Sequence, residues 1–314
     1  MSRDQLLKGS VNMEVHLRPM THDDLKMATT WETMAGWTND YCMREMLFEL
    51  YGDSHEIAET EDGEAIGFTS PNVISQDLAF LETIFIREDF RGKQIGKYLM
   101  NKMMDTYSDR NFWLNADTGK EGFYQKLGFK VGAKTAKCTG NVSEDVIERV
   151  KDDGAFKTDG STVTTEPAGE KLFKDLKKFE MTTLNISRQS FFEKWFESEL
   201  HKPICALARD KDGVVIGYAL CRRLIYETTS DVTQSYVINP LVADDGRIAN
   251  RLFRNIYISL PIGSKITFKS PNYHGGVERL VGKFNLEVES QGTAMFSKDL
   301  NPIDFSKIYS FFPY

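Results

Sequence analysis

The stretch ETIFIREDFRGKQIGKYLM, residues 82–100, decides the fold. It begins inside the near-continuous apolar run LAFLETIFI at 78–86, which predicts a strand covered on both faces. It continues into a segment with apolar residues at Ile95, Leu99 and Met103, a spacing that predicts a helix. The glycine-bearing loop between them therefore joins a buried strand to a helix N-terminus.

The loop sequence Arg91-Gly-Lys-Gln-Ile-Gly96 has the chemistry of an anion site. A helix N-terminus offers unpaired backbone N–H groups and the positive end of a dipole. Glycines let the main chain approach a bound group closely, and Arg91, Lys93 and Lys97 add positive charge. The spacing is neither a Walker loop nor a dinucleotide fingerprint, but the combination suits a pyrophosphate.

The order of elements around this segment occurs twice in the chain. A helix, a hairpin, an apolar strand, a loop, a second helix, a strand, a short helix and a strand follow one another in each half. The hairpins turn at Asp62-Gly63 and Asp212-Gly213. The pattern predicts a duplicated α/β domain. The expected boundaries are 10–140 for the first domain, 141–178 for a linker with one strand at 161–165, 179–300 for the second domain and 301–314 for a tail.

Composition narrows the function classes. The net charge is −7, from 39 basic and 46 acidic side chains, which argues against a general nucleic-acid binder. No apolar run approaches the ~20 residues that span a bilayer, and the N-terminal residues lack the apolar core of a signal peptide. We therefore expect a cytoplasmic protein, with the nucleus as an alternative, and no membrane partner. The 4 cysteines and 5 histidines do not cluster, so neither a metal site nor a disulfide framework is expected.

Two motifs resemble those of the GCN5-related N-acetyltransferases (GNAT). The family's acetyl-CoA motif, R/Q-x-x-G-x-G/A, is matched by Arg91 and Gly96, with Ile86 as the aliphatic residue five positions before Arg91. Gln94 departs from the motif, because the family usually has its first glycine there. A second family motif appears as FYQKLGF at 123–129, about 30 residues further on, with one strand between. The resemblance implies two tandem GNAT-type domains, each built on a splayed mixed sheet.

The resemblance also implies how acetyl-CoA is bound as a cosubstrate. The strand before the loop should part from its neighbour and leave a V-shaped cleft, in which backbone groups of Ile84 and Ile86 pair with the pantetheine arm. The amides of residues 94–97 would hold the pyrophosphate. Asp117 stands where many members have an Asn that contacts pantetheine. The expected cofactor-binding residues are Ile84, Phe85, Ile86, Arg91, Gly92, Lys93, Gln94, Ile95, Gly96, Lys97 and Asp117.

Two side chains are candidates for the acid–base work of acetyl transfer to an amine. Glu82 lies where some members keep an acidic residue near the acceptor amine, and the alternative is an exposed strand carboxylate. Tyr124 matches the family tyrosine near the CoA sulfur, which can act as a general acid, and the alternative is an aromatic side chain on an amphipathic helix. His55 is a weaker candidate for the base.

The second half lacks these groups when the two halves are aligned on the helices after the loops. Ser235 then falls opposite Glu82, and Asp244 falls opposite Arg91. The final helices place Val281 opposite Tyr124. The pair Asp244-Asp245 suits a helix N-cap better than a diphosphate site, so we expect no ordinary acetyl-CoA turnover in this half.

The expected function is N-acetyl transfer from acetyl-CoA by the first half. A small-molecule or peptide amine would attack the thioester directly in a ternary complex, because no covalent nucleophile is apparent. Two rival interpretations stay open, an acyl-CoA-binding regulator with weak turnover and an interaction protein. The sequence does not identify the acceptor amine or the oligomeric state.

Overall fold

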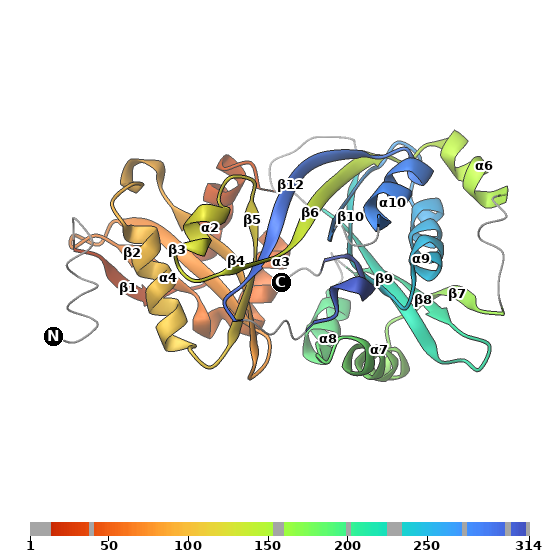
Figure 1. Ribbon diagram of the computed structural model, residues 1–314, viewed down its shortest axis with the longest axis horizontal. Coiled ribbons are helices and arrows are strands. Elements are labelled where there is room, and N and C mark those ends of the chain that lie inside the picture. The colour runs from red at the N-terminus through yellow and green to blue at the C-terminus, as the bar shows by residue number, and fades with distance from the viewer. Residues whose placement is uncertain are drawn as a thin grey trace. The chain divides into compact units, whose positions relative to one another are not determined.

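The chain divides into two compact units, each described separately below. The structure is a computed structural model that describes residues 14–37, 41–152, 160–198, 202–224, 234–271, 275–298 and 303–311. Unit 1 contains residues 1–131 and 295–300, and unit 2 contains residues 132–294 and 301–313. Each unit is a mixed sheet with helices packed on its faces (Figure 1).

The elements of unit 1 begin with a short edge strand and end with a strand followed by a short helix. Its elements are β1 (His16–Pro19), α2 (Asp24–Met34), α3 (Tyr41–Tyr51), η1 (Gly52–Ser54), β2 (Glu56–Glu59), β3 (Ala65–Val73), β4 (Leu78–Ile86), η2 (Glu88–Phe90), α4 (Ile95–Thr106), β5 (Asn111–Asp117) and α5 (Glu121–Gln125). The strands run in the order β1-β2-β3-β4-β5, antiparallel except for the parallel pair β4–β5.

The two faces of the unit 1 sheet are covered by different helices. Leu25 and Ala28 of α2 pack with Phe68 and Phe85 on one face. Ile95 and Leu99 of α4 pack against the other face. The alternation follows from the strand period of two, which sends neighbouring side chains of β4 to opposite faces.

Unit 2 repeats this arrangement and adds elements of its own. Its elements are β6 (Lys130–Asn141), α6 (Glu144–Asp152), β7 (Thr162–Glu166), α7 (Glu170–Thr183), α8 (Gln189–Glu197), β8 (Ile204–Arg209), β9 (Val215–Arg223), β10 (Ser235–Ala243), α9 (Gly246–Ser259), β11 (Lys265–Pro271), α10 (Gly276–Phe284), β12 (Glu287–Phe296), η4 (Phe305–Lys307) and β13 (Ile308–Ser310). The strand order is β12-β6-β11-β10-β9-β8-β7, with β13 paired to β10.

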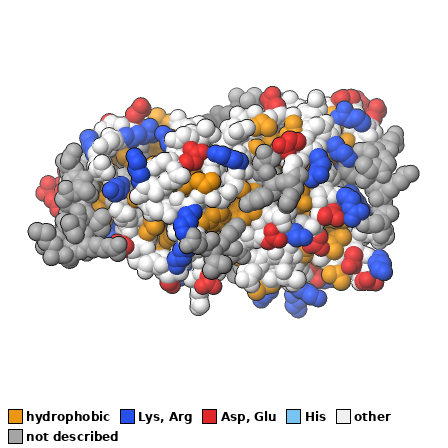
Figure 2. Space-filling view, in the orientation of Figure 1, with side chains coloured by type: hydrophobic (Ala, Val, Ile, Leu, Met, Phe, Trp, Pro, Cys, Tyr) orange, Lys and Arg blue, Asp and Glu red, His pale blue; other side chains and the backbone are white. Residues whose placement is uncertain are grey.

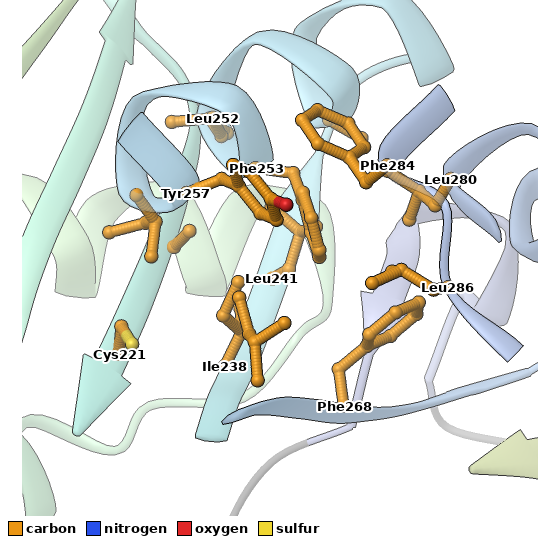
Figure 3. Close-up of a cluster of buried hydrophobic side chains, with 14 of the residues drawn as sticks. Cys221, Ile238, Leu241, Leu252, Phe253, Tyr257, Phe268, Leu280, Phe284 and Leu286 are labelled. Atoms are coloured by element: carbon orange, nitrogen blue, oxygen red, sulfur yellow. The ribbon is translucent and has the colours of Figure 1, made fainter. Parts of the chain in front are cut away.

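The main core of unit 2 lies between α9, α10 and the sheet. Phe253 and Tyr257 of α9 meet Phe284 of α10, with ring centres 4.6 and 5.1 Å apart, and Phe268 of β11 completes the cluster (Figure 3). On the opposite face, Tyr218 packs edge-on against aromatic rings of α7 and α8. Both faces of the central strands are therefore buried.

The backbone pairing confirms the duplication predicted from the sequence. In each unit three antiparallel strands lead to a strand that pairs in parallel with the one after the long helix. Gly63 and Gly213 turn the two corresponding hairpins with φ of 82° and 79°. The α/β fold class with two similar domains is confirmed.

The segment 141–178, expected as a linker, carries regular structure and lies in unit 2. It contains α6, β7 and the start of α7. Leu172, Leu176 and Phe179 recur at helical spacing along α7 and are buried. Lys174, Lys177 and Lys178 between them are exposed on the solvent face of this amphipathic helix, which is why the segment resembled a polar linker.

The last residues of β12 belong to unit 1. Met295 packs among buried side chains of β5 and α4, and the N–H of Ser297 donates to the carbonyl oxygen of Phe112 at 2.9 Å. The described residues include no helix long and apolar enough to cross a membrane.

Candidate active site

Strand β4 leaves its parallel neighbour β5 early. Leu78–Phe80 pair with Asn111–Trp113, and the β4–β5 ladder ends there. On its other edge β4 stays paired with β3 as far as Ile86. The two strands therefore open into a V, and the backbone of residues 84–86 forms part of one wall. This confirms the splayed sheet expected for unit 1.

The loop after β4 leads to a helix N-terminus without a side-chain cap. Gly92 and Gln94 adopt left-handed backbone conformations, with φ of 78° and 66°. No side chain caps α4, and its first intrahelical bond runs from the N–H of Tyr98 to the carbonyl of Gln94 at 3.0 Å. The amides of residues 95–97 precede that bond, so they are available to an anion at the positive end of the helix dipole.

Three cations accompany this helix start. The Nε of Arg91 donates to the carbonyl oxygen of Ile86 at 3.0 Å, which fixes the guanidinium at the end of β4. The Nζ of Lys93 lies 4.5 Å from the ring centre of Phe90. Lys97 follows in the first turn of α4. Figure 2 shows Lys and Arg side chains spread over the visible face of unit 1.

The backbone explains how Gln94 replaces the usual glycine. A left-handed conformation at this position turns the chain into α4, and glycine adopts it without steric cost. Gln94 adopts the same conformation at a cost of about 1 kcal/mol. Gly96, in contrast, faces the cleft side. A Cβ there would lie 3.8 Å from Ile86 and Phe123, which is an ordinary contact distance, so an alanine fits at this position.

Asp117 is the last residue of β5, the opposite wall of the V, and Tyr124 follows on α5 (Glu121–Gln125). Asp117 is exposed at the end of β5, and its carbonyl accepts from the N–H of Lys120 at 2.9 Å. The Tyr124 ring packs edge-on against Phe123 and Phe129. Burial, with a smaller effect from the charge of Asp117, raises the pKa of Tyr124 to about 12. The hydroxyl therefore stays protonated at neutral pH and can donate.

Glu82 occupies a β-bulge. Ser70 of β3 pairs with Thr83 and the next residue pairs with Leu81, so Glu82 is the extra residue on β4. A bulge redirects a side chain. Here Oε2 of Glu82 lies 3.8 Å from Nη1 of Arg44 and 3.5 Å from Nδ2 of Asn72. The side chain is 14% exposed, so the carboxylate is largely buried within a polar cluster.

His55 does not have the environment of a general base. It is 1% exposed, and burial is the main cause that lowers its pKa to about 4. Its Nε2 lies 3.0 Å from Oδ1 of Asn72. The sequence analysis missed Asn72 and Arg44, although Arg44, between the apolar residues Met43 and Met46 of α3, was a signal for a buried ion pair.

The strand registers show that the sequence alignment of the two halves is wrong at the position corresponding to Glu82. Gly67 pairs with Ile86 in unit 1, and Gly217 pairs with Ala243 at the same place in unit 2. Glu82 comes four residues before Ile86, so its counterpart is Asn239, four residues before Ala243, and not Ser235. Alignment on the helices failed here because the second loop is shorter. Ile95 comes nine positions after Ile86, whereas Ile248 comes five positions after Ala243.

In unit 2, the corresponding opening between β10 and β11 offers neither an uncapped helix N-terminus nor a free strand edge. Asp245 caps α9, and its carboxylate accepts from the N–H groups of Arg247 and Ile248. Strand β10 pairs with β11 only over residues 235–237, and beyond that point β13 fills the opening. Directly after β13, the N–H of Phe311 donates to the carbonyl oxygen of Lys269 in β11 at 2.8 Å.

The remaining alignment across the two halves is consistent with the structure. The helices α5 and α10 end alike, because the N–H of Phe129 bonds to Tyr124 and the N–H of Leu286 bonds to Val281. Val281 therefore stands where unit 1 has Tyr124. Among the described residues no group of His, Cys, Asp and Glu could hold a metal ion.

A substitution at Gln94 tests the backbone argument. Gln94→Gly should raise the free energy of unfolding by up to about 1 kcal/mol, because glycine relieves the left-handed strain and loses some of that gain to unfolded-state entropy. The comparison change Gln189→Gly, at the first residue of α8, should lower it by up to about 1 kcal/mol, because it gives up right-handed helical backbone preference and the side-chain bond to Glu193. Urea unfolding of both variants measures this, and destabilisation by Gln94→Gly would contradict the argument.

Comparisons with known proteins agree with this geometry. The family model "Acetyltransferase (GNAT) family" matches residues 22–129, and "Acetyltransferase (GNAT) domain" matches residues 178–310. A putative acetyltransferase from Pyrococcus horikoshii is similar in structure, with TM-score 0.69, 15% identity, and coverage of 95% of this chain and 94% of that one. A GCN5-related N-acetyltransferase from Sphaerobacter thermophilus has TM-score 0.60, 14% identity, and coverage of 93% and 98%.

A third similar structure is a tandem GNAT protein from the clavulanic acid biosynthesis pathway, with TM-score 0.61, 11% identity, and coverage of 92% of this chain and 100% of that one. At these identities the three structures establish the fold alone. No curated protein matches the chain. The two family matches together cover most of the sequence, and the chain belongs to the GNAT acetyltransferase superfamily as a member with two GNAT domains in tandem.

Proposed function

We propose that unit 1 transfers an acetyl group from acetyl-CoA to an amine, and that unit 2 carries out no such transfer. The observation that carries the proposal is the contrast between the two V-shaped openings. The opening between β4 and β5 leads to an uncapped helix N-terminus with three cations. The opening between β10 and β11 is filled by β13 and leads to a helix capped by Asp245.

The residues of unit 1 fit acetyl-CoA in charge and shape. The free edge of β4 at Ile84 and Ile86 supplies backbone donors and acceptors for the amides of the pantetheine arm. The amides of residues 94–97 and the charge of Arg91 suit the pyrophosphate, since charge-assisted bonds to phosphate are among the strong ones. Phe85, Gly92, Lys93 and Asp117 would complete the cofactor surface.

Glu82 and Tyr124 would share the proton transfers. Glu82 takes the proton that the amine loses as its nitrogen forms a bond to the thioester carbonyl carbon. When the carbon–sulfur bond breaks, the Tyr124 hydroxyl donates to the departing sulfur. A pKa of about 12 keeps this donor protonated over the whole neutral range.

Direct attack is favoured over a covalent acyl-enzyme. A thiol nucleophile needs a lowered pKa and access to substrate. Burial instead raises the pKa of Cys138 to about 12, and it also raises the pKa values of Cys205 and Cys221, all in unit 2. The remaining cysteine, Cys42 of α3 in unit 1, is partly buried. The amine would therefore attack the thioester itself, within a ternary complex.

Charge reversal at the loop tests which unit binds the cofactor. Arg91→Glu should weaken acetyl-CoA binding about 10- to 100-fold, because it removes a contact worth about 1.5–3 kcal/mol and adds repulsion. Asp244→Ala, at the corresponding place in unit 2, should leave the affinity unchanged. Isothermal titration calorimetry on both variants measures this, and equal effects would contradict the assignment to unit 1.

Removal of the Tyr124 hydroxyl tests whether this group takes part in turnover. Tyr124→Phe keeps the ring packing, so acetyl-CoA affinity should stay the same while turnover falls about 10²–10⁴-fold. CoA release with a library of amines, or slow acetyl-CoA hydrolysis, provides the assay.

Full activity in the Tyr124→Phe variant would remove Tyr124 from the mechanism. Acetyl-CoA binding by the unaltered chain without CoA release from any amine would favour an acyl-CoA-binding regulator. The absence of any thermal shift with acetyl-CoA would favour an interaction protein.

A further inference from the structure

A buried polar cluster lies beside Glu82, and it has two branches. In the first, Arg44 of α3 bonds to Glu32 of α2, whose Oε1 also accepts from the hydroxyl of Thr83 at 2.6 Å. In the second, His55 contacts Asn72 at 3.0 Å, and Asn72 contacts Glu82 at 3.5 Å. Both branches end at the same carboxylate oxygen, Oε2 of Glu82.

The second branch has a defined direction. An ionised carboxylate only accepts hydrogen bonds, so Asn72 must turn its NH₂ group toward Glu82 and its carbonyl oxygen toward His55. The imidazole must then donate from Nε2. Since His55 is neutral at physiological pH, it is the tautomer with hydrogen on Nε2, and each group in the series donates toward Glu82.

Unit 2 has a counterpart of the first branch but not of the second. Glu180 and Arg188 form a buried ion pair there, as Glu32 and Arg44 do in unit 1. The strand registers give the positions that correspond to the other branch: Cys205 for His55, Arg222 for Asn72 and Asn239 for Glu82. The ion pair is thus common to both units and serves the fold, whereas the His55–Asn72 branch occurs only in the unit that has the carboxylate.

We propose that Asn72, oriented by His55, is a positioning residue that holds the Glu82 carboxylate ionised and aimed from its bulge for proton transfer. The proposal rests on the proposed function, in which Glu82 is the base. Asn72 acts through Glu82 and touches no substrate. Its side-chain NH₂ group is a neutral hydrogen-bond donor, which stabilises the charged form of the carboxylate without adding another charge.

The charged and titratable groups around Glu82 allow this effect to be isolated. They are Arg44 on α3, Glu32 on α2 and His55 before β2. Burial opposes the charge of Arg44, but the neighbouring carboxylates of Glu32 and Glu82 outweigh it and raise the pKa of Arg44 above its usual value. Arg44 therefore stays charged at physiological pH, and changes at Asn72 act on Glu82 beside a constant positive charge.

The test follows the ionisation of Glu82 without needing an acceptor. In the full chain labelled with ¹³C at glutamate carboxyl carbons, Glu82→Gln identifies the Glu82 signal, and its titration midpoint is measured by NMR. Asn72→Leu should raise the midpoint by about one pH unit, because losing a hydrogen bond to a charged group costs about tenfold in the ionisation equilibrium. Thr69→Val is the matched control, since it makes a buried polar side chain on the same strand apolar, and it should leave the midpoint unchanged.

Variants at His55 keep the proposal testable if Asn72→Leu does not fold. His55→Gln retains an N–H donor and should keep the midpoint near that of the unaltered chain, whereas His55→Leu should raise it. An unchanged midpoint in folded Asn72→Leu, or in folded His55→Leu, would overturn the proposal. Failure of the proposed function would be a separate result. Full turnover by Glu82→Gln would show that Glu82 is not the base, and it would not alter the titration midpoints measured for the Asn72 and His55 variants.

Discussion

The backbone of β4 beyond Phe80 is the feature on which the account of this protein depends. A strand inside a sheet normally has both edges hydrogen-bonded, and unpaired backbone groups away from water are costly. Strand β4 pairs along one edge to Ile86 but pairs along the other only to Phe80. Something other than β5 must satisfy the second edge, and the amide-rich arm of a cofactor can act as that missing strand.

The second unit meets the same constraint in a different way. Strand β10 separates from β11 after Val237, and β13 supplies the missing partner from the chain's own sequence. The loss of four loop residues and the Asp245 cap then leave the start of α9 without an anion site. Duplication of one fold has thus produced one opening that can take a ligand and one that is satisfied internally.

The features of the fold that depend on local sequence pattern were predicted from the sequence. The apolar run of β4, the helical spacing of Ile95 and Leu99, and the two Asp-Gly turns were enough for the duplicated α/β fold. The family resemblance of Arg91 and Gly96 pointed to the loop. The cap at Asp245 also followed from its residue type, because an aspartate before a helix is a strong N-cap.

The sequence could not predict contacts between distant segments. Arg44, Asn72 and Glu82 lie on three different elements, and only the folded chain brings them together. The pairing of β13 with β10 depends on a three-residue strand far along the chain. The position of Asn239 was missed because a shorter loop shifts the strand relative to the helix, and an alignment of helices alone does not reveal that shift.

A crystal structure of the chain with acetyl-CoA is the most direct test of the central claim. The account predicts one cofactor per chain, with its pantetheine arm along the free edge of β4, its pyrophosphate at the amides of residues 94–97, and β13 still paired with β10. A cofactor bound between β10 and β11, with β13 displaced, would contradict it.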